Sequence, residues 1–256
     1  MSGVEILSLI AAAVAAGIIN AIAGGGTLVT FPTLLLFGTT PVIANATSTL
    51  ALVIGTVGSI FGYREQIAMV RPWLARFVPV SLAGGLLGSV LLTHTSDQAF
   101  GKLVPFLILF ATVLFLAQGT FREFAKEHTG PAGMASRAVW VAIFFQFAVA
   151  IYGGFFGAGI GILMLASLGF IGLHEIHQMN ALKNILGSLI NCVAAAWFVA
   201  SGLIDWPKAG VMTIGAVFGY WLGAHFSQRI PQSRVRAIIT AIGLVMSAVT
   251  FWKQFR

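Results

Sequence analysis

The chain has 256 residues, of which 58% are hydrophobic and 8% are charged, and its formal net charge is +7. A soluble domain carries about 25% charged residues, so this composition excludes a water-soluble globular protein and predicts an all-α polytopic membrane protein. Most of the 14 lysines and arginines fall in short connections, as topology signals do, and we therefore predict no nucleic-acid partner.

Eight apolar stretches are long enough to cross a bilayer as transmembrane helices, which takes about 20 residues. Two further apolar pieces, 27–37 and 160–172, are too short to cross upright, and we expect broken or re-entrant segments there. The chain is thus expected in the lipid bilayer of the cell inner (cytoplasmic) membrane, as a multi-pass protein. In chain order, the long stretches are 4–22, 43–63, 73–92, 100–118, 137–155, 178–200, 207–226 and 235–252.

The two sides of the longest hydrophilic connection, 119–137, resemble each other. A shift of 135 residues, without a gap, places glycines, an Asn-Ala pair and a proline of the first side on identical residues of the second. We therefore predict two membrane repeats, 1–121 and 136–256, joined by a connecting loop at 122–135. The matching residues are Ala23, Gly24, Gly26, Asn45, Ala46, Pro72, Gly84 and Gly88 with Ala158, Gly159, Gly161, Asn180, Ala181, Pro207, Gly219 and Gly223.

Equivalent connections in the two repeats carry opposite charge bias. Three arginines lie in or next to the connection before the third long stretch, whereas the counterpart in the second repeat has Lys208 near Asp205. The next connection reverses this bias, with Lys102 in the first repeat and three arginines in the second. Since basic residues mark one side of the membrane, the reversal favours inverted repeats over parallel ones. The arginines are Arg64, Arg71 and Arg76 in the first repeat and Arg229, Arg234 and Arg236 in the second.

Glycine clusters interrupt both regions in which a long apolar stretch meets a short one. The first is Gly24-Gly25-Gly26 and the second is Gly157-Ala158-Gly159-Ile160-Gly161. Glycine weakens a helix interior by about 1 kcal/mol relative to alanine, and irregular backbone at membrane depth is tolerated only inside protein or beside a watery cavity. Paired interruptions of this kind indicate the binding site of a transporter.

Helices that begin just after these clusters would suit an anion. A helix starting at Thr27 or Ile162 directs free N–H groups and a positive dipole end outward. Two such ends that converge near the membrane midplane would attract negative charge from both sides. Close helix packing, which small residues also permit, is the alternative interpretation of the glycines.

Polar residues open the long stretch that follows each short piece. They are Asn45, Thr47 and Ser48 in the first repeat and Asn180, Lys183 and Asn184 in the second. We predict that these side chains donate hydrogen bonds to the anion. We also predict that Lys183 is its electrostatic anchor, because a lysine at the membrane centre costs at least about 2.5 kcal/mol. Helix capping by the asparagines and snorkelling of Lys183 to the interface are the alternatives.

A histidine near Lys183 is the candidate for coupling. His177 titrates near neutral pH and could carry a coupling proton, with a plain loop residue as the alternative. Its spacing to the preceding His174 and Glu175 is not the His-Glu-x-x-His pattern of a zinc site. We therefore predict no metal and no cofactor.

Two groups of motifs resemble those of a known family. The first is Asn20-Ala21-Ile22-Ala23-Gly24-Gly25-Gly26 with Pro32, Pro41 and Asn45-Ala46-Thr47-Ser48. The second is Gly154-Phe155-Phe156-Gly157-Ala158-Gly159-Ile160-Gly161 with Asn180-Ala181-Leu182-Lys183-Asn184. Together they resemble the two halves of the TauE/SafE sulfite-exporter family over nearly the whole chain. The resemblance implies a multi-pass bacterial-type carrier linked to sulfite, sulfonates or related sulfur-containing or carboxylate anions.

We therefore predict a secondary transporter, an exporter, of a small anion, with sulfite and organosulfonates as the leading candidates. A small-anion channel is the first alternative and an intramembrane enzyme the second. We expect no enzyme, since the apolar stretches hold no aspartate and no Walker loop occurs. The expected partners are the anion, lipid and a coupling proton or sodium ion, and the question of a homo-oligomer stays open. The predicted substrate-binding residues are Gly24, Gly25, Gly26, Thr27, Asn45, Thr47, Ser48, Gly159, Gly161, Asn180, Lys183 and Asn184.

Overall fold

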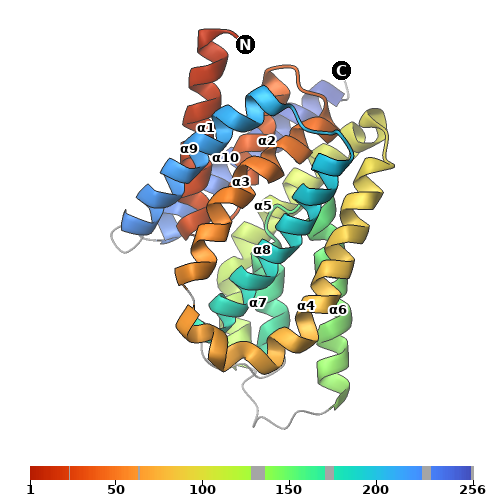
Figure 1. Ribbon diagram of the computed structural model, residues 1–256, viewed down its shortest axis with the longest axis vertical. Helices are drawn as coiled ribbons and strands as arrows, with labels where there is room; N and C mark the ends of the chain where they lie inside the picture. The colour runs from red at the N-terminus through yellow and green to blue at the C-terminus, as the bar shows by residue number, and fades with distance from the viewer. Residues whose placement is uncertain (23, 63, 128–135, 171–175, 227–231, 255–256) are drawn as a thin grey trace.

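The computed structural model describes the chain except residues 23, 63, 128–135, 171–175, 227–231 and 255–256 (Figure 1). Within the described ranges all regular structure is α-helical. In chain order the helices are α1 Gly3–Ile22, α2 Thr27–Leu36, α3 Pro41–Gly62, α4 Arg64–Thr93, α5 Asp97–Glu127, α6 Ser136–Phe155, α7 Ile160–Phe170, α8 Ile176–Ala200, α9 Trp206–Phe226 and α10 Gln232–Gln254.

Every apolar stretch predicted from the sequence overlaps one of these helices, and the two short pieces correspond to α2 and α7. The helices α4 and α5 are longer than predicted. The segment 64–72, expected as a connection, is the first part of α4, and α5 continues through residues 122–127. Hydropathy reports only the apolar part of a helix, whereas the Arg, Glu, Gln and Lys residues of these segments also favour helix.

Among the described residues, four helices are long and apolar enough to cross a membrane, namely the segments Gly3–Ala21, Val70–Thr93, Asp97–Ala117 and Ala181–Ala200. Shorter apolar helical segments accompany them at Thr27–Leu36, Pro41–Thr56, Val139–Phe155 and Ala237–Trp252. Large apolar side chains such as Phe144, Ile214 and Trp221 are exposed on the outer surface. Together these features confirm a multi-pass, helical membrane protein.

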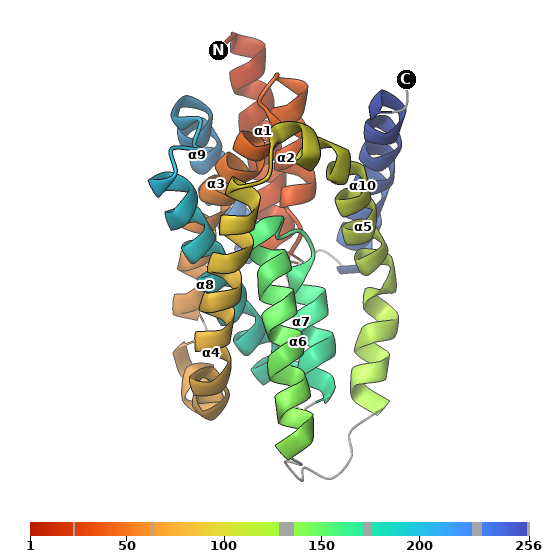
Figure 2. The same cartoon turned by 90° about the vertical axis from the view of Figure 1, so that its right-hand side faces the viewer.

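Helices from the two halves of the chain interleave. The helix α1 lies along α9, and α4 lies along α6 and α8 (Figures 1 and 2). Glycines make these approaches close, because a Cβ atom on Gly88 would collide with the Ile151 carbonyl and one on Gly219 with the Val14 carbonyl. These glycines therefore serve the close packing that small residues permit between membrane helices.

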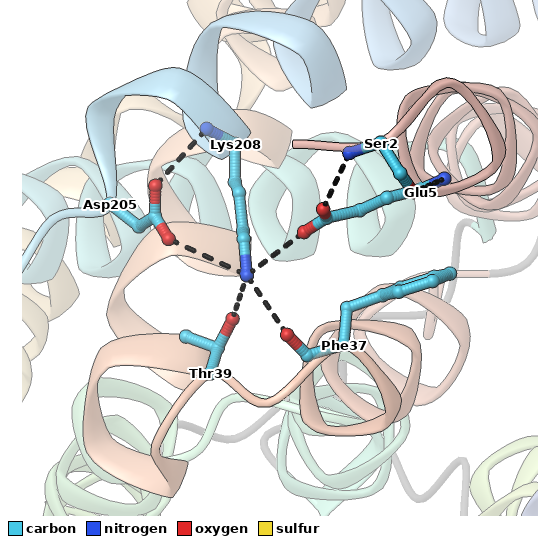
Figure 3. A network of polar contacts seen from close by, with 6 residues as sticks. All are labelled: Ser2, Glu5, Phe37, Thr39, Asp205 and Lys208. Atoms are coloured by element: carbon cyan, nitrogen blue, oxygen red, sulfur yellow. Dashed lines mark hydrogen bonds and ion pairs between the residues drawn. The ribbon is translucent and has the colours of Figure 1, made fainter.

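An ionic network closes the end of the molecule that carries both termini (Figures 1 and 3). Lys208 Nζ lies 3.2 Å from Glu5 Oε1 and 3.7 Å from Asp205 Oδ2. It also donates to the carbonyl of Phe37 at 3.2 Å and to Thr39 Oγ1 at 2.9 Å. Lys208, which the sequence offered only as a topology signal, thus joins α1, the α2–α3 connection and α9.

Candidate substrate site at the two glycine breaks

The first break, between α1 and α2, is closed by hydrogen bonds of its own. Gly24 has φ +80° and Gly25 has φ +98°, a left-handed conformation that other residues adopt only at a cost. The Gly26 N–H donates to Asn20 Oδ1 at 2.7 Å, and the Leu28 N–H donates to the Gly25 carbonyl at 3.0 Å. The amides that begin α2 are therefore largely occupied.

The second break, between α6 and α7, has a similar backbone. Gly157 has φ +81° and Gly159 has φ +79°. The Tyr152 hydroxyl donates to the Ala158 carbonyl at 2.7 Å and so fixes the turn from within α6. The Ile162 N–H donates to the Gly159 carbonyl at 3.0 Å, which is the bond that starts the next helix.

The beginning of α7 nevertheless keeps free donors. Among the described residues, the amides of Gly159, Ile160 and Gly161 make no hydrogen bond. Unpaired N–H groups at a helix start, together with the helix dipole, form a ready binding site for negative charge. The two breaks thus differ: Asn20 occupies an amide of the first, and no described side chain does so in the second.

Both breaks contact the same aromatic ring. A Cβ atom placed on Gly25 would lie 2.7 Å from Cε2 of Phe115 in α5, and one placed on Gly159 would lie 3.7 Å from the same atom. Phe115 is 1% exposed, so this meeting point is inside the protein. Sequence reasoning missed Phe115, because nothing in its own segment marks it.

Lys183 lies against the start of α7. A Cβ atom on Gly161 would be 3.3 Å from Lys183 Cδ, so the hydrocarbon part of the lysine runs across the space that this glycine leaves. Gly161 does not have a positive φ, so a glycine is favoured here because it leaves space for the Lys183 side chain and not because of its backbone conformation. Within the described part of the chain, the half-buried Lys183 has no hydrogen-bond or ion-pair partner.

The polar residues at the start of α3 already have partners. Asn45 Nδ2 donates to the Phe155 carbonyl at 3.1 Å, across to the end of α6. The Thr47 hydroxyl accepts from the Asp205 N–H at 3.1 Å. The Ser48 hydroxyl lies 2.6 Å from that of Thr30 in α2. These contacts hold α2, α3, α6 and the α8–α9 connection together.

One atom of this group remains unsatisfied. Asn45 is 1% exposed, and its Oδ1 has no partner in the described part of the chain. Because Nδ2 must be the atom that faces the Phe155 carbonyl, the free atom is an acceptor. An acceptor suits a cation or a protonated group better than an anion.

The remaining predicted residues are placed as follows. Gly24 lies at a point of the first break where a Cβ would meet open space. Thr27, the first residue of α2, and Asn184 in α8 are both half-buried. Asn180 and His177 belong to the first turns of α8, but their side chains lie outside the described part of the structure.

Apolar helices that enclose two glycine breaks are typical of multi-pass membrane transporters. A family model described as "Sulfite exporter TauE/SafE" matches residues 9–250, and the chain belongs to this family. No solved structure matches the chain significantly.

Curated relatives point to the same class. The chain is 28% identical over 255 residues to a "Probable membrane transporter protein" of Haemophilus influenzae, covering 98% of this chain and 97% of the relative. It is 25% identical to the "Probable membrane transporter protein YfcA" of Escherichia coli K12, covering 92% and 86%. It is also 25% identical to the "Probable membrane transporter protein YunE" of Bacillus subtilis, covering 90% and 91%. The protein is therefore a membrane transporter by family.

Proposed function

We propose that the protein is a secondary transporter that exports a small anion across the cell inner membrane. The observation that carries this proposal is the approach of Lys183 to the start of α7, where three amides lack partners among the described residues. An unpaired lysine beside free N–H donors inside a membrane protein attracts an anion and little else. The family description makes sulfite, an organosulfonate or a related carboxylate the first compounds to test.

The arrangement of the helices supports two inverted repeats, α1–α5 and α6–α10. The same pairs of helices are in contact when the two halves exchange roles, so that α1 to α5 stand for α6 to α10 and the reverse. The contact of α1 with α9 then corresponds to that of α6 with α4, and the contact of α5 with α7 corresponds to that of α10 with α2. In Figure 2, α1 starts at the end that carries the termini, whereas α6 starts at the opposite end. Such repeats place a substrate site at their interface.

In this proposal eight helices cross the membrane, and the short α2 and α7 form re-entrant segments beside α1 and α6. Transport follows from movement of one repeat against the other around the breaks. The Lys208 network would hold the end with the termini closed in one of the two states. His177 and the unpaired Asn45 Oδ1 are the residues to test for coupling to a proton or a sodium ion.

Flux measurements on purified protein in liposomes test this function. We expect uptake of radiolabelled sulfite or methanesulfonate that saturates with concentration and depends on a proton or sodium gradient. Linear flux that ignores the gradient would indicate an anion channel, and chemical conversion of the compound would indicate an enzyme. Either result would contradict the proposal.

A further inference from the structure

Three buried side-chain polar atoms have no partner within the described part of the chain: Asn45 Oδ1, Gln146 Oε1 and the hydroxyl of Tyr220. The two amide oxygens can only accept hydrogen bonds, whereas a phenol can donate one. Leaving a buried polar group unpaired costs about 1–3 kcal/mol. Tyr220 is therefore a buried donor whose hydroxyl proton has no acceptor among the described residues.

Tyr220 is packed closely against α1 and α3. Tyr220 belongs to α9 and is 9% exposed. A Cβ atom on Gly55 of α3 would collide with the ring, and one on Gly17 of α1 would come within 2.7 Å of the Tyr220 amide nitrogen. Gly55 thus provides the room that the Tyr220 ring occupies, and Gly17 lets α1 approach the backbone of Tyr220.

Asn20 connects this hydroxyl with the first break. The Asn20 side chain faces the Tyr220 hydroxyl, although the two do not reach hydrogen-bond geometry. The Gly26 N–H can only donate, so the Asn20 atom that it contacts at 2.7 Å must be Oδ1. The nitrogen Nδ2 of Asn20 is then free for other partners, and like the Tyr220 hydroxyl it can donate hydrogen bonds.

These contacts give a fixed direction of donation. Gly26 donates to Asn20, and Asn20 offers its own N–H groups onward. The proton of the Tyr220 hydroxyl is left without an acceptor in the described part of the chain. A ligand that completes the arrangement must therefore accept hydrogen bonds and need not donate any. Sulfite and sulfonates in their ionised forms have only acceptor oxygens.

We propose that Asn20 and Tyr220 donate hydrogen bonds to the transported anion at the first break. In this way they complement Lys183 and the free amides at the second. In this proposal one anion accepts from both breaks, which contact the same ring, that of Phe115, through Gly25 and Gly159. This inference rests on the proposed function, and it narrows the substrate to an oxyanion without hydrogen-bond donors at the transport pH.

The test uses the purified full chain in lipid nanodiscs, with calorimetry for methanesulfonate and for sulfite and with thermal melts without either compound. Tyr220→Phe removes only the hydroxyl. We expect affinity for methanesulfonate to fall about ten- to a hundredfold, as for a hydrogen bond to a charged group. The melting temperature should not fall, because an unpaired buried group has been removed.

Two further variants sharpen the test. Tyr152→Phe is the matched control for stability, since the Tyr152 hydroxyl has a partner in Ala158, and it should lower the melting temperature. Asn20→Asp keeps an oxygen for the Gly26 amide but replaces the donor group with a negative charge. It should weaken binding more than Tyr220→Phe does.

Several outcomes would overturn the inference. Unchanged methanesulfonate affinity in Tyr220→Phe would do so while leaving the proposed function intact, provided that the wild type binds and Lys183→Met binds more weakly. A lower melting temperature in Tyr220→Phe would show that the hydroxyl has an internal partner. A wild-type protein that binds neither anion would refute this inference and, with it, sulfite and organosulfonates as substrates in the proposed function.

Discussion

The two glycine breaks lie at equivalent positions in the two halves of the chain, but they differ in whether their polar groups have hydrogen-bond partners. In the first, Asn20 accepts from Gly26, and Ser48 is hydrogen-bonded to Thr30. In the second, the residue that matches Ser48 after a shift of 135 is Lys183, which has no partner in the described part of the chain. The hydroxyl pair of Thr30 and Ser48 joins two helices in the first half, whereas the second half has the charged Lys183 at the position of Ser48.

Under the proposed repeats, this difference teaches how two similar halves can build an asymmetric site. The shared glycines give each half a break in the backbone, and close packing brings both breaks to Phe115. A symmetric pair of hydroxyls would be satisfied within the chain and would leave nothing for a ligand. In the proposed site, the single lysine makes one break positive, and the donors of the other break act on the same anion.

The comparison depends first on the opposite orientation of the halves. Arg71 and Trp206 correspond after the shift of 135, and both are exposed. Single cysteines at these positions, in a chain with Cys192→Ala, should label from opposite sides of the membrane, an all-or-none difference. The measurement is reaction with a membrane-impermeant maleimide in oriented vesicles. Labelling of both from one side would contradict inverted repeats.

The next largest effect is expected at the first break. Gly25→Leu should abolish transport, because Gly25 has φ +98° and its side-chain position is occupied by the Phe115 ring. Gly210→Leu is the matched control, since a Cβ there meets nothing within 4 Å. Flux in liposomes with equal amounts of folded protein checks this. Normal flux in Gly25→Leu would mean that the break plays no part.

Removing the charge of the second break tests the asymmetry directly. Lys183→Met keeps most of the stem but loses the ammonium group, and anion binding should weaken by about 1.5–3 kcal/mol, roughly ten- to more than a hundredfold. Stability should not fall, because a desolvation cost is removed. Lys183→Arg should keep part of the affinity.

Calorimetry with a parallel thermal melt separates these effects, and Lys102→Met, at an exposed lysine, serves as the control. A Lys183→Met protein that binds normally but melts earlier would instead agree with snorkelling of the lysine to the interface.

A smaller effect is expected from a substitution at Gly161, against which the Lys183 side chain packs. Gly161→Ala adds a Cβ at 3.3 Å from Lys183 Cδ, a distance at which the flexible stem must shift slightly. Anion affinity should fall by less than about tenfold, while helix stability rises by up to about 1 kcal/mol. The same calorimetry and melts measure both. An earlier melt would show that Lys183 cannot move aside.

The smallest effect concerns the neutral pair of the first half. Ser48→Ala removes the hydroxyl that contacts Thr30, although Thr30 keeps a 3.3 Å bond to the Gly26 carbonyl. Stability should drop by about 1 kcal/mol, which lowers the melting temperature by about 2–4 °C. A large loss of anion affinity without a lower melting temperature would place Ser48 in the site and weaken the contrast with Lys183.

The helix bounds also show that an ungapped shift of 135 residues does not align the two halves throughout. A shift of 135 pairs Gly24 with Gly159, but the helices around the breaks correspond at 133, since α1 ends at Ile22 and α6 at Phe155. The start of α3 and that of α8 correspond at 135. The offset therefore grows by two residues between the start of the short helix and the start of the long helix that follows it.

The sequence by itself determined the membrane class, the order of long and short helices and the two breaks, because apolar length and glycine content act locally along the chain. Only the tertiary structure decided which polar groups are already occupied. Asn45 donates to Phe155, 110 residues away, and Thr47 accepts from Asp205, 158 residues away. Tyr220 had no signal in its own segment, since its place is made by Gly17 and Gly55 on other helices. The free energy of a buried polar group depends on its partners, and those partners are brought together only by packing.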